Sequence, residues 1–91
     1  MIELPKQLEK CKATPIFTEH TLPKGLQETH KTKAGTWARI VIHEGTIVYM
    51  SERADWKREL ISAGQHVIIQ PEEPHHLKLC GSVSLKIEFY R

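Results

Sequence analysis

The sequence has no long hydrophobic run. Its longest aliphatic stretches span residues 40–42 and 67–69, whereas a membrane-spanning helix needs about 18 or more consecutive apolar residues. The N-terminus also lacks the basic segment followed by an apolar stretch that a secretory signal requires. We therefore expect no membrane helix, no membrane partner and a cytoplasmic location.

Cysteine is scarce. The chain contains only Cys11 and Cys80, and their wide separation does not match the spacing of a metal-binding cysteine pair. In a reducing compartment both thiols stay free. We expect them to be small buried hydrophobic residues without a functional part.

No excess of one charge is present. The 13 Lys and Arg residues and the 11 Asp and Glu residues leave a net charge of +2, and the basic residues are scattered rather than gathered in a stripe. The sequence therefore gives no sign of a nucleic-acid partner. It also lacks a glycine-rich phosphate loop, a nucleophile elbow and a histidine pair at helical spacing, which argues against the enzyme classes that use them.

What is present fits one globular domain, spanning residues 1–91. The chain has 91 residues, of which 40% are hydrophobic and 26% are charged, close to the composition of an ordinary globular domain. Scaling of surface with mass indicates that about 64% of the unfolded surface is buried on folding. A chain of this size can form a modest hydrophobic core without disulfides.

Short strands separated by turn residues dominate the pattern. Glycines and prolines at positions 45, 64, 71, 74 and 81 punctuate segments rich in β-branched and aromatic residues, which is typical of strands joined by tight turns. The expected strands are residues 36–43, 46–50, 56–61, 66–70, 75–80 and 83–90, with a weaker strand signal at 10–17. Many short strands and no long helical period predict an all-β fold, an antiparallel jelly-roll barrel or sandwich.

The last expected strand alternates most cleanly. One face carries Val83, Leu85, Ile87 and Phe89, and the other carries Ser84, Lys86, Glu88 and Tyr90. Successive side chains of a strand point to opposite faces, so the apolar set faces the core. We expect Glu88 to be a solvated carboxylate on the outer face.

Histidine is over-represented, with six in the chain: His20, His30, His43, His66, His75 and His76. Alternation along residues 75–80 puts His75 on the face of Leu77 and Leu79, and His76 on the opposite face. An inward imidazole after a proline turn is either a packed core histidine or a metal ligand. His43 and His66 lie at strand ends, where we expect exposure.

Basic residues follow His30 closely. Lys31, Lys33 and Arg39 lie within one short stretch of the sequence. They indicate either a small anion-binding patch, with Lys31 and Arg39 as candidate ligand-binding residues, or a solvated basic loop.

Several segments resemble a known family. Residues 64–75 (GQHVIIQPEEPH) resemble the second cupin motif, in which a glycine turn, an apolar strand and a proline turn deliver a metal-binding histidine into a small jelly-roll barrel. Residues 14–18 (TPIFT), 21–23 (TLP), 30–37 (HKTKAGTW) and 88–91 (EFYR) are similar to the TehB/YeaR-like domain family, and the resemblance covers nearly the whole chain. That family consists of small cupin-like proteins, found alone or fused to the methyltransferase of a tellurite-resistance protein.

The resemblance implies a metal pair formed by His30 and His75, with a divalent ion such as Zn²⁺, Fe²⁺ or Ni²⁺ as cofactor. A full first cupin motif supplies His-x-His followed by Glu, whereas this sequence has His30-Lys31-Thr32 and no carboxylate in residues 34–39. A stable site takes at least three protein ligands. The site is therefore incomplete, completed by water or by a residue such as His76 or His43, or vestigial.

Three functions follow from these observations. The first is a cupin-like binding or stress-response module that holds a small molecule, an oxyanion or a metal at the barrel mouth, linked by the resemblance to tellurite resistance. The second is a small metal-dependent enzyme of the dioxygenase or isomerase type. The third is an interaction unit that forms a homodimer. Because no glycine-rich loop for S-adenosylmethionine is present, methyl transfer is not assigned to this sequence.

Overall fold

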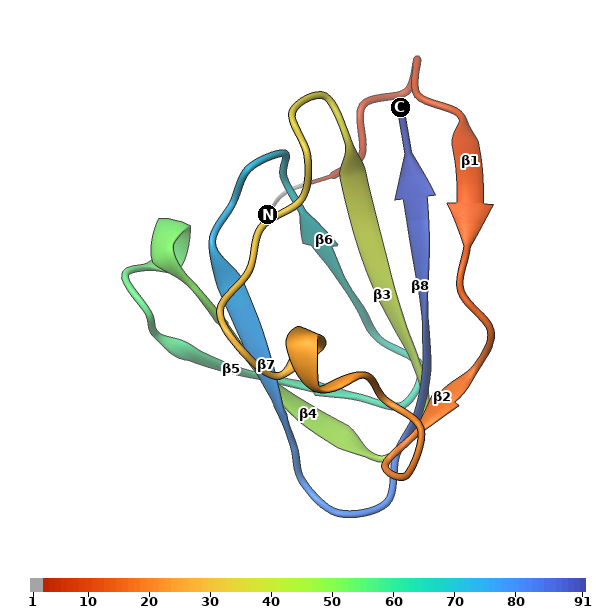
Figure 1. Cartoon of the computed structure of the whole chain (residues 1–91), viewed down its shortest axis with the longest axis vertical. Coiled ribbons are helices and arrows are strands. Elements are labelled where there is room, and N and C mark those ends of the chain that lie inside the picture. The colour runs from red at the N-terminus through yellow and green to blue at the C-terminus, as the bar shows by residue number, and fades with distance from the viewer. Residues whose placement is uncertain (1–2) are drawn as a thin grey trace.

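A computed structural model describes residues 3–91 (Figure 1). It is built almost entirely from strands, which confirms the expected all-β class. The strands are β1 (Lys10–Ala13), β2 (Phe17–Thr18), β3 (Trp37–Glu44), β4 (Thr46–Ser51), β5 (Arg58–Ser62), β6 (His66–Ile69), β7 (His75–Leu79) and β8 (Ser84–Tyr90). Two single-turn 3₁₀ helices, η1 (Lys24–Leu26) and η2 (Glu52–Ala54), complete the elements. Within the described range, no helix is long and apolar enough to cross a membrane.

The strands form two antiparallel sheets. One sheet has the order β1-β8-β3-β6, with β2 also paired to β8, and the other has the order β5-β4-β7. Among residues 3–91 no strand of one sheet pairs with a strand of the other, so the barrel is not closed. The architecture is the sandwich form of the expected fold, with the sheets packed face to face (Figure 1).

Alternation along the strands builds the core between the sheets. In the larger sheet Ile40 lies opposite both Val67 and Ile87, and in the smaller sheet Tyr49 lies opposite Leu77. All five side chains are buried, and burial of one large aliphatic side chain contributes about 1.5–3 kcal/mol. The expected inward face of β8 is confirmed, since Val83, Leu85 and Ile87 are all buried.

The expected strand at 56–61 is wrong at its beginning. Asp55 and Trp56 both adopt a φ of 58°, the left-handed region that extended strands do not use. They form the turn that follows η2, and β5 begins only at Arg58. The other strands expected from residue 36 onward begin and end within one or two residues of the observed bounds.

The expected burial of the cysteines is also wrong. Both Cys11 and Cys80 are exposed free thiols. Cys11 lies on the edge strand β1, all four residues of which are exposed. Cys80 follows the last residue of β7, where the chain turns toward β8. Sequence composition alone does not reveal which strand lies at a sheet edge.

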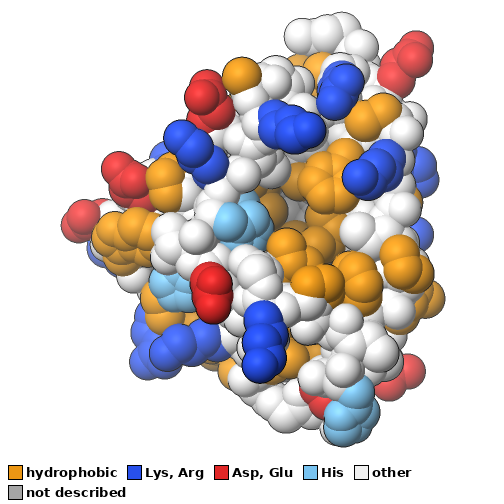
Figure 2. All heavy atoms as spheres, in the orientation of Figure 1, with side chains coloured by type: hydrophobic (Ala, Val, Ile, Leu, Met, Phe, Trp, Pro, Cys, Tyr) orange, Lys and Arg blue, Asp and Glu red, His pale blue; other side chains and the backbone are white. Residues whose placement is uncertain are grey.

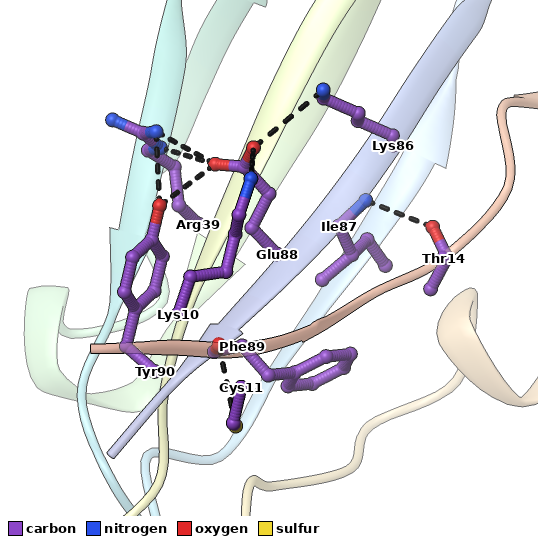
Figure 3. A network of polar contacts seen from close by, with 9 residues as sticks. All are labelled: Lys10, Cys11, Thr14, Arg39, Lys86, Ile87, Glu88, Phe89 and Tyr90. Carbon is purple, nitrogen blue, oxygen red and sulfur yellow. Dashed lines mark hydrogen bonds and ion pairs between the residues drawn. The ribbon is translucent and has the colours of Figure 1, made fainter.

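Glu88 corrects a further expectation. It lies on the outer face, as alternation predicts, yet it is only 4% exposed. Arg39 donates to Glu88 Oε1 from Nε at 2.9 Å and from Nη2 at 2.7 Å, and the Tyr90 hydroxyl donates to the same oxygen at 2.9 Å. Lys10 and Lys86 lie 3.4 Å and 3.5 Å from Oε2. These long side chains cover the carboxylate (Figure 3).

The network also sets the ionisation of Glu88. Burial alone raises the pKa of this carboxyl, but the hydrogen bonds from Arg39 and Tyr90 outweigh burial and lower the pKa to about 2. Because Lys10, Arg39 and Glu88 belong to β1, β3 and β8, the charged cluster joins three adjacent strands on the outside of the sandwich.

We predict that Glu88→Gln lowers the free energy of unfolding by about 2 kcal/mol at neutral pH, because charged hydrogen bonds are replaced by weaker ones. The folded pKa of Glu88 lies below the ordinary value of 4.5. The stabilisation is therefore complete above about pH 4.5 and is lost as the pH falls toward 2. Urea unfolding at several pH values measures it, with the exposed Glu59→Gln as control. Equal losses in both variants would contradict the prediction.

The turn from β3 to β4 depends on Gly45. This residue has a φ of +81°, and an added Cβ would clash with the backbone carbonyl oxygen of Ser82. Gly64 has a similar φ of +85° but no atom within 4 Å of an added Cβ. A comparison of substitutions at Gly45 and Gly64 therefore separates the cost of a left-handed backbone from the cost of a clash between the added Cβ and Ser82.

We predict that Gly45→Ala destabilises the protein clearly more than Gly64→Ala. The left-handed backbone costs about 1–2 kcal/mol at either position, and only Gly45→Ala must also displace the backbone at Ser82. Thermal unfolding of the two variants tests this. Equal losses in the two variants would contradict the prediction, because they would show that the backbone at Ser82 moves aside at little cost.

Candidate ligand-binding cavity

A cavity of about 260 Å³ lies between the sheets. Its deep wall is apolar and is formed by core residues of both sheets, among them Ala38, Ile40, Ile69, Leu77 and Ile87. His30 and His75 also line it. Figure 2 shows a hollow in the face of the molecule that is turned toward the viewer, with hydrophobic side chains inside it and a histidine at its wall.

The two histidines are held together by the backbone. His30 and His75 form an isolated antiparallel bridge in which each backbone N–H donates to the other residue's carbonyl at 2.9 Å. Their ring centroids are 4.2 Å apart, with the planes at 62°. His75, the first residue of β7, is 2% exposed, which confirms the inward orientation expected from alternation.

The hydrogen bonds of the imidazoles fix their tautomers. His75 Nδ1 lies 2.7 Å from the Glu73 carbonyl oxygen, and His30 Nδ1 lies 2.9 Å from the Glu28 carbonyl oxygen. A carbonyl only accepts, so each Nδ1 carries the proton and each neutral ring has an unprotonated Nε2. Burial, together with the neighbouring His30, lowers the pKa of His75 and favours its neutral form.

The Nε2 atom of His75 faces the cavity. No hydrogen bond to this atom is formed by residues 3–91, and no fully buried side-chain nitrogen or oxygen in that range lacks a partner. The atom must therefore keep access to the cavity that His75 lines. His75 therefore offers a hydrogen-bond acceptor to whatever occupies this space.

Glu73 fixes the turn that presents His75. Its carboxylate is buried and accepts hydrogen bonds from the Tyr49 hydroxyl at 2.7 Å, the Ser51 hydroxyl at 2.6 Å and the Gln70 backbone N–H at 3.2 Å. The Tyr49 ring also stacks on His75, with centroids 5.8 Å apart. The Glu73 backbone carbonyl, which orients His75, is thus held by a side chain anchored to β4.

The Glu73 carboxylate stays ionised in this setting. Burial alone raises its pKa, but hydrogen bonds from Ser51, Tyr49 and Gln70 together lower it, and Arg53 Nε adds a contact at 3.2 Å. Burial and the hydrogen bond to Glu73 raise the pKa of Tyr49, so the phenol remains a donor. None of the side chains of Glu73, Tyr49, Ser51 and Arg53 lines the cavity.

The mouth of the cavity is basic. Lys31 and Lys33 follow His30, Lys12 comes from β1, and Arg91 directly follows β8. No Asp or Glu is among the described residues that line the cavity. The exposed side chains that line this cavity therefore include four cations.

The structure brings together only some of the residues singled out from the sequence. Lys31 lies at the cavity with His30 and His75, whereas Arg39 lies on the outer face of the larger sheet, bound to Glu88. His43 is exposed at the end of β3. His76 faces away from the cavity, where its ring stacks on Trp56 at 5.7 Å and its Nδ1 lies 3.5 Å from Thr29 Oγ1.

Sequence reasoning missed the carboxylate that supports the site. Two features of the sequence pointed to this network. Glu73 stands in the expected turn before His75, and Tyr49 lies on the same strand face as Ile47, which is buried. Nothing in the sequence showed that β4 lies beside β7 and brings Tyr49 and Ser51 to Glu73. Lys12 and Arg91 were missed for the same reason, because the pairing of β1 with β8 brings these two ends of the chain side by side at the cavity.

The donor set does not fit a resident metal ion held by this chain alone. His30 and His75 have the anchored Nδ1 and free Nε2 that metal-binding histidines use. No group of three or more His, Cys, Asp and Glu side chains arranged for a metal occurs in residues 3–91. Stable zinc or iron sites use at least three protein ligands, and this pair supplies two.

The fold and site define a small β-sandwich domain with a cavity between its two sheets. Comparison with known families matches residues 12–87 to the TehB-like domain. The chain therefore belongs to the TehB-like domain family, as the resemblance indicated.

Two relatives are similar over most of the chain. The uncharacterized protein YeaR of Escherichia coli K12 is 25% identical, over 99% of this chain and 83% of that protein. The probable S-adenosyl-L-methionine-dependent methyltransferase TehB of Haemophilus influenzae strain 10810 is 29% identical over 87% of this chain. The match covers only 29% of that methyltransferase, so its activity is not carried over.

Solved structures share the fold. A crystal structure of an E. coli K12 protein has a TM-score of 0.90 at 24% identity, covering 100% of this chain and 97% of that one. TehB from H. influenzae has a TM-score of 0.83 at 24% identity, covering 93% of this chain and 32% of that one. HppE with Fe(II) has a TM-score of 0.63 at 15% identity, over 98% of this chain and 59% of that one.

We predict that Glu73→Gln lowers the free energy of unfolding by about 2–3 kcal/mol, because an amide cannot accept from all the donors that Glu73 satisfies. The neighbouring Glu72, which is exposed, provides the matched control Glu72→Gln. Urea unfolding measures both. A loss in Glu72→Gln as large as that in Glu73→Gln would contradict the assigned role of the network.

Proposed function

We propose that this protein is a binding module that holds a small ligand in the cavity at His30 and His75. The observation that carries the proposal is the composition of this space. Among residues 3–91, two imidazoles without a hydrogen-bond partner at Nε2 lie against an apolar wall, and lysines and an arginine line the mouth with no Asp or Glu side chain. A concave apolar pocket with a few convergent polar groups is the usual form of a small-molecule site.

The charge of the mouth favours an anionic ligand. Clefts lined by one sign of charge raise the local concentration of the opposite ion. The family's link to tellurite resistance, given by the resemblance, makes tellurite a natural first probe. A part in stress response and a cytoplasmic homodimer belong to the same proposal, and sedimentation at micromolar concentration tests the dimer.

A second candidate is a small metal-dependent enzyme. It is favoured by the anchoring of both Nδ1 atoms to carbonyl oxygens, which leaves both Nε2 atoms free. It requires a third ligand, because residues 3–91 bring no further His, Cys, Asp or Glu side chain together with His30 and His75 in a metal-binding arrangement. Elemental analysis of protein purified without chelator separates the two candidates.

We predict that tellurite and other small anions raise the thermal midpoint in proportion to the logarithm of their concentration. His75→Ala removes this response, whereas His66→Ala, which changes an exposed histidine at the start of β6, retains it. We expect less than one equivalent of Zn, Fe or Ni in the purified protein.

Two results would contradict the proposal. A flat response to tellurite, phosphate and small organic anions alike would exclude a binding module for anions. Near-stoichiometric metal, lost in both His30→Ala and His75→Ala, would favour the metal-dependent enzyme instead.

A further inference from the structure

We propose that the cavity binds a small organic carboxylate with an apolar body and a hydroxyl or amino group, rather than a bare inorganic oxyanion. This inference rests on the proposed binding function and names its ligand class. Three features of the cavity carry it: its size, the charge of its mouth and the acceptors at its wall.

The size of the cavity calls for more than an oxyanion. Its volume of about 260 Å³ far exceeds the ~10–15 Å³ that one water molecule requires by the same kind of measure. Ile40, Ile69 and Leu77 form part of its wall. A four- or five-atom oxyanion would leave these apolar surfaces against water, whereas a hydrocarbon body would cover them and gain the free energy of apolar burial.

The mouth supplies the charge preference. Lys12, Lys31, Lys33 and Arg91 reach it from three separate segments of the chain. The nearest buried carboxylates do not cancel this charge at the cavity, because Glu73 and Glu88 are each engaged by their own partners and neither lines it. A ligand carboxylate at the mouth meets cations without a competing Asp or Glu side chain among the described lining residues.

The wall supplies the third requirement. His30 and His75 both line the cavity, and each donates Nδ1–H to a carbonyl oxygen, so each keeps an unprotonated Nε2 with no partner among residues 3–91. An acceptor is satisfied by a hydroxyl or amino hydrogen, and a fully deprotonated oxyanion has none to give. Leaving a desolvated acceptor unpaired is costly, which selects for a ligand with a donor at this end.

Calorimetric titration with a matched set of compounds tests the three features separately. 4-Hydroxybenzoate and 6-hydroxyhexanoate each have a carboxylate, an apolar body and a hydroxyl donor, on an aromatic and an aliphatic framework respectively. Benzoate lacks the donor, 4-hydroxybenzamide lacks the charge, and tellurite and phosphate lack the apolar body. We expect one of the two hydroxy acids to bind most tightly, and the analogue that lacks the donor or the charge to bind about fivefold or more weakly.

Variants locate the contacts. Lys31→Gln with Lys33→Gln weakens the hydroxy acid about fivefold and leaves the neutral amide unchanged. His30→Phe removes one acceptor and reduces the preference for 4-hydroxybenzoate over benzoate. The matched control is Lys24→Gln with Lys57→Gln, which changes two exposed lysines that do not line the cavity.

The outcomes distinguish this inference from the binding function beneath it. Tellurite or phosphate binding as tightly as both hydroxy acids, or the amide binding as tightly as its acid, would overturn the ligand class while the binding module stands. Absence of binding by every compound in the set would overturn both.

Discussion

The site depends on a buried carboxylate. Glu73 lies in the turn between β6 and β7 and is 5% exposed, a position at which an unpaired charge would be strongly destabilising. Hydroxyls of Tyr49 and Ser51 from the adjacent strand β4 satisfy it. The turn is thereby fixed to the smaller sheet, and its carbonyl oxygen orients the ring of His75.

This constraint extends to His30. The segment that contains His30 carries no strand, yet its backbone pairs with His75 through two hydrogen bonds. Lys31 and Lys33 follow it to the cavity mouth. The second buried carboxylate, Glu88, is neutralised on the outer face by Arg39 and its neighbours. Both acids are thus kept away from the cavity, which leaves its mouth cationic.

The sequence was most informative where local pattern decides the outcome. Alternation correctly placed His75 inside, and the β-branched runs with glycine turns marked the strands from residue 36 onward. Residue spacing failed where the outcome depends on strand pairing. Arg39 is close to His30 in the sequence, but it lies on the outer face of β3, so the expected basic patch is divided between two sides of a sheet.

Exposure was the harder property to predict. Alternation indicated the correct face for Glu88, but it could not show that Arg39, Lys10 and Tyr90 cover that face. The same limit applies to Cys11, whose exposure follows from the edge position of β1. Arg91 and Glu73 belong to the site only because the fold brings together segments that are distant in the sequence.

Both imidazoles that line the cavity leave Nε2 unprotonated, the state in which they accept a hydrogen bond from a ligand. Long-range proton–nitrogen NMR of ¹⁵N-histidine-labelled protein at about pH 8, above the ordinary pKa of an imidazole in a model peptide, tests this directly. We predict the Nδ1–H tautomer for His30 and His75, and a shift of their Nε2 signals when a ligand binds. The Nε2–H tautomer at either residue, or Nε2 signals unmoved by a bound ligand, would contradict it.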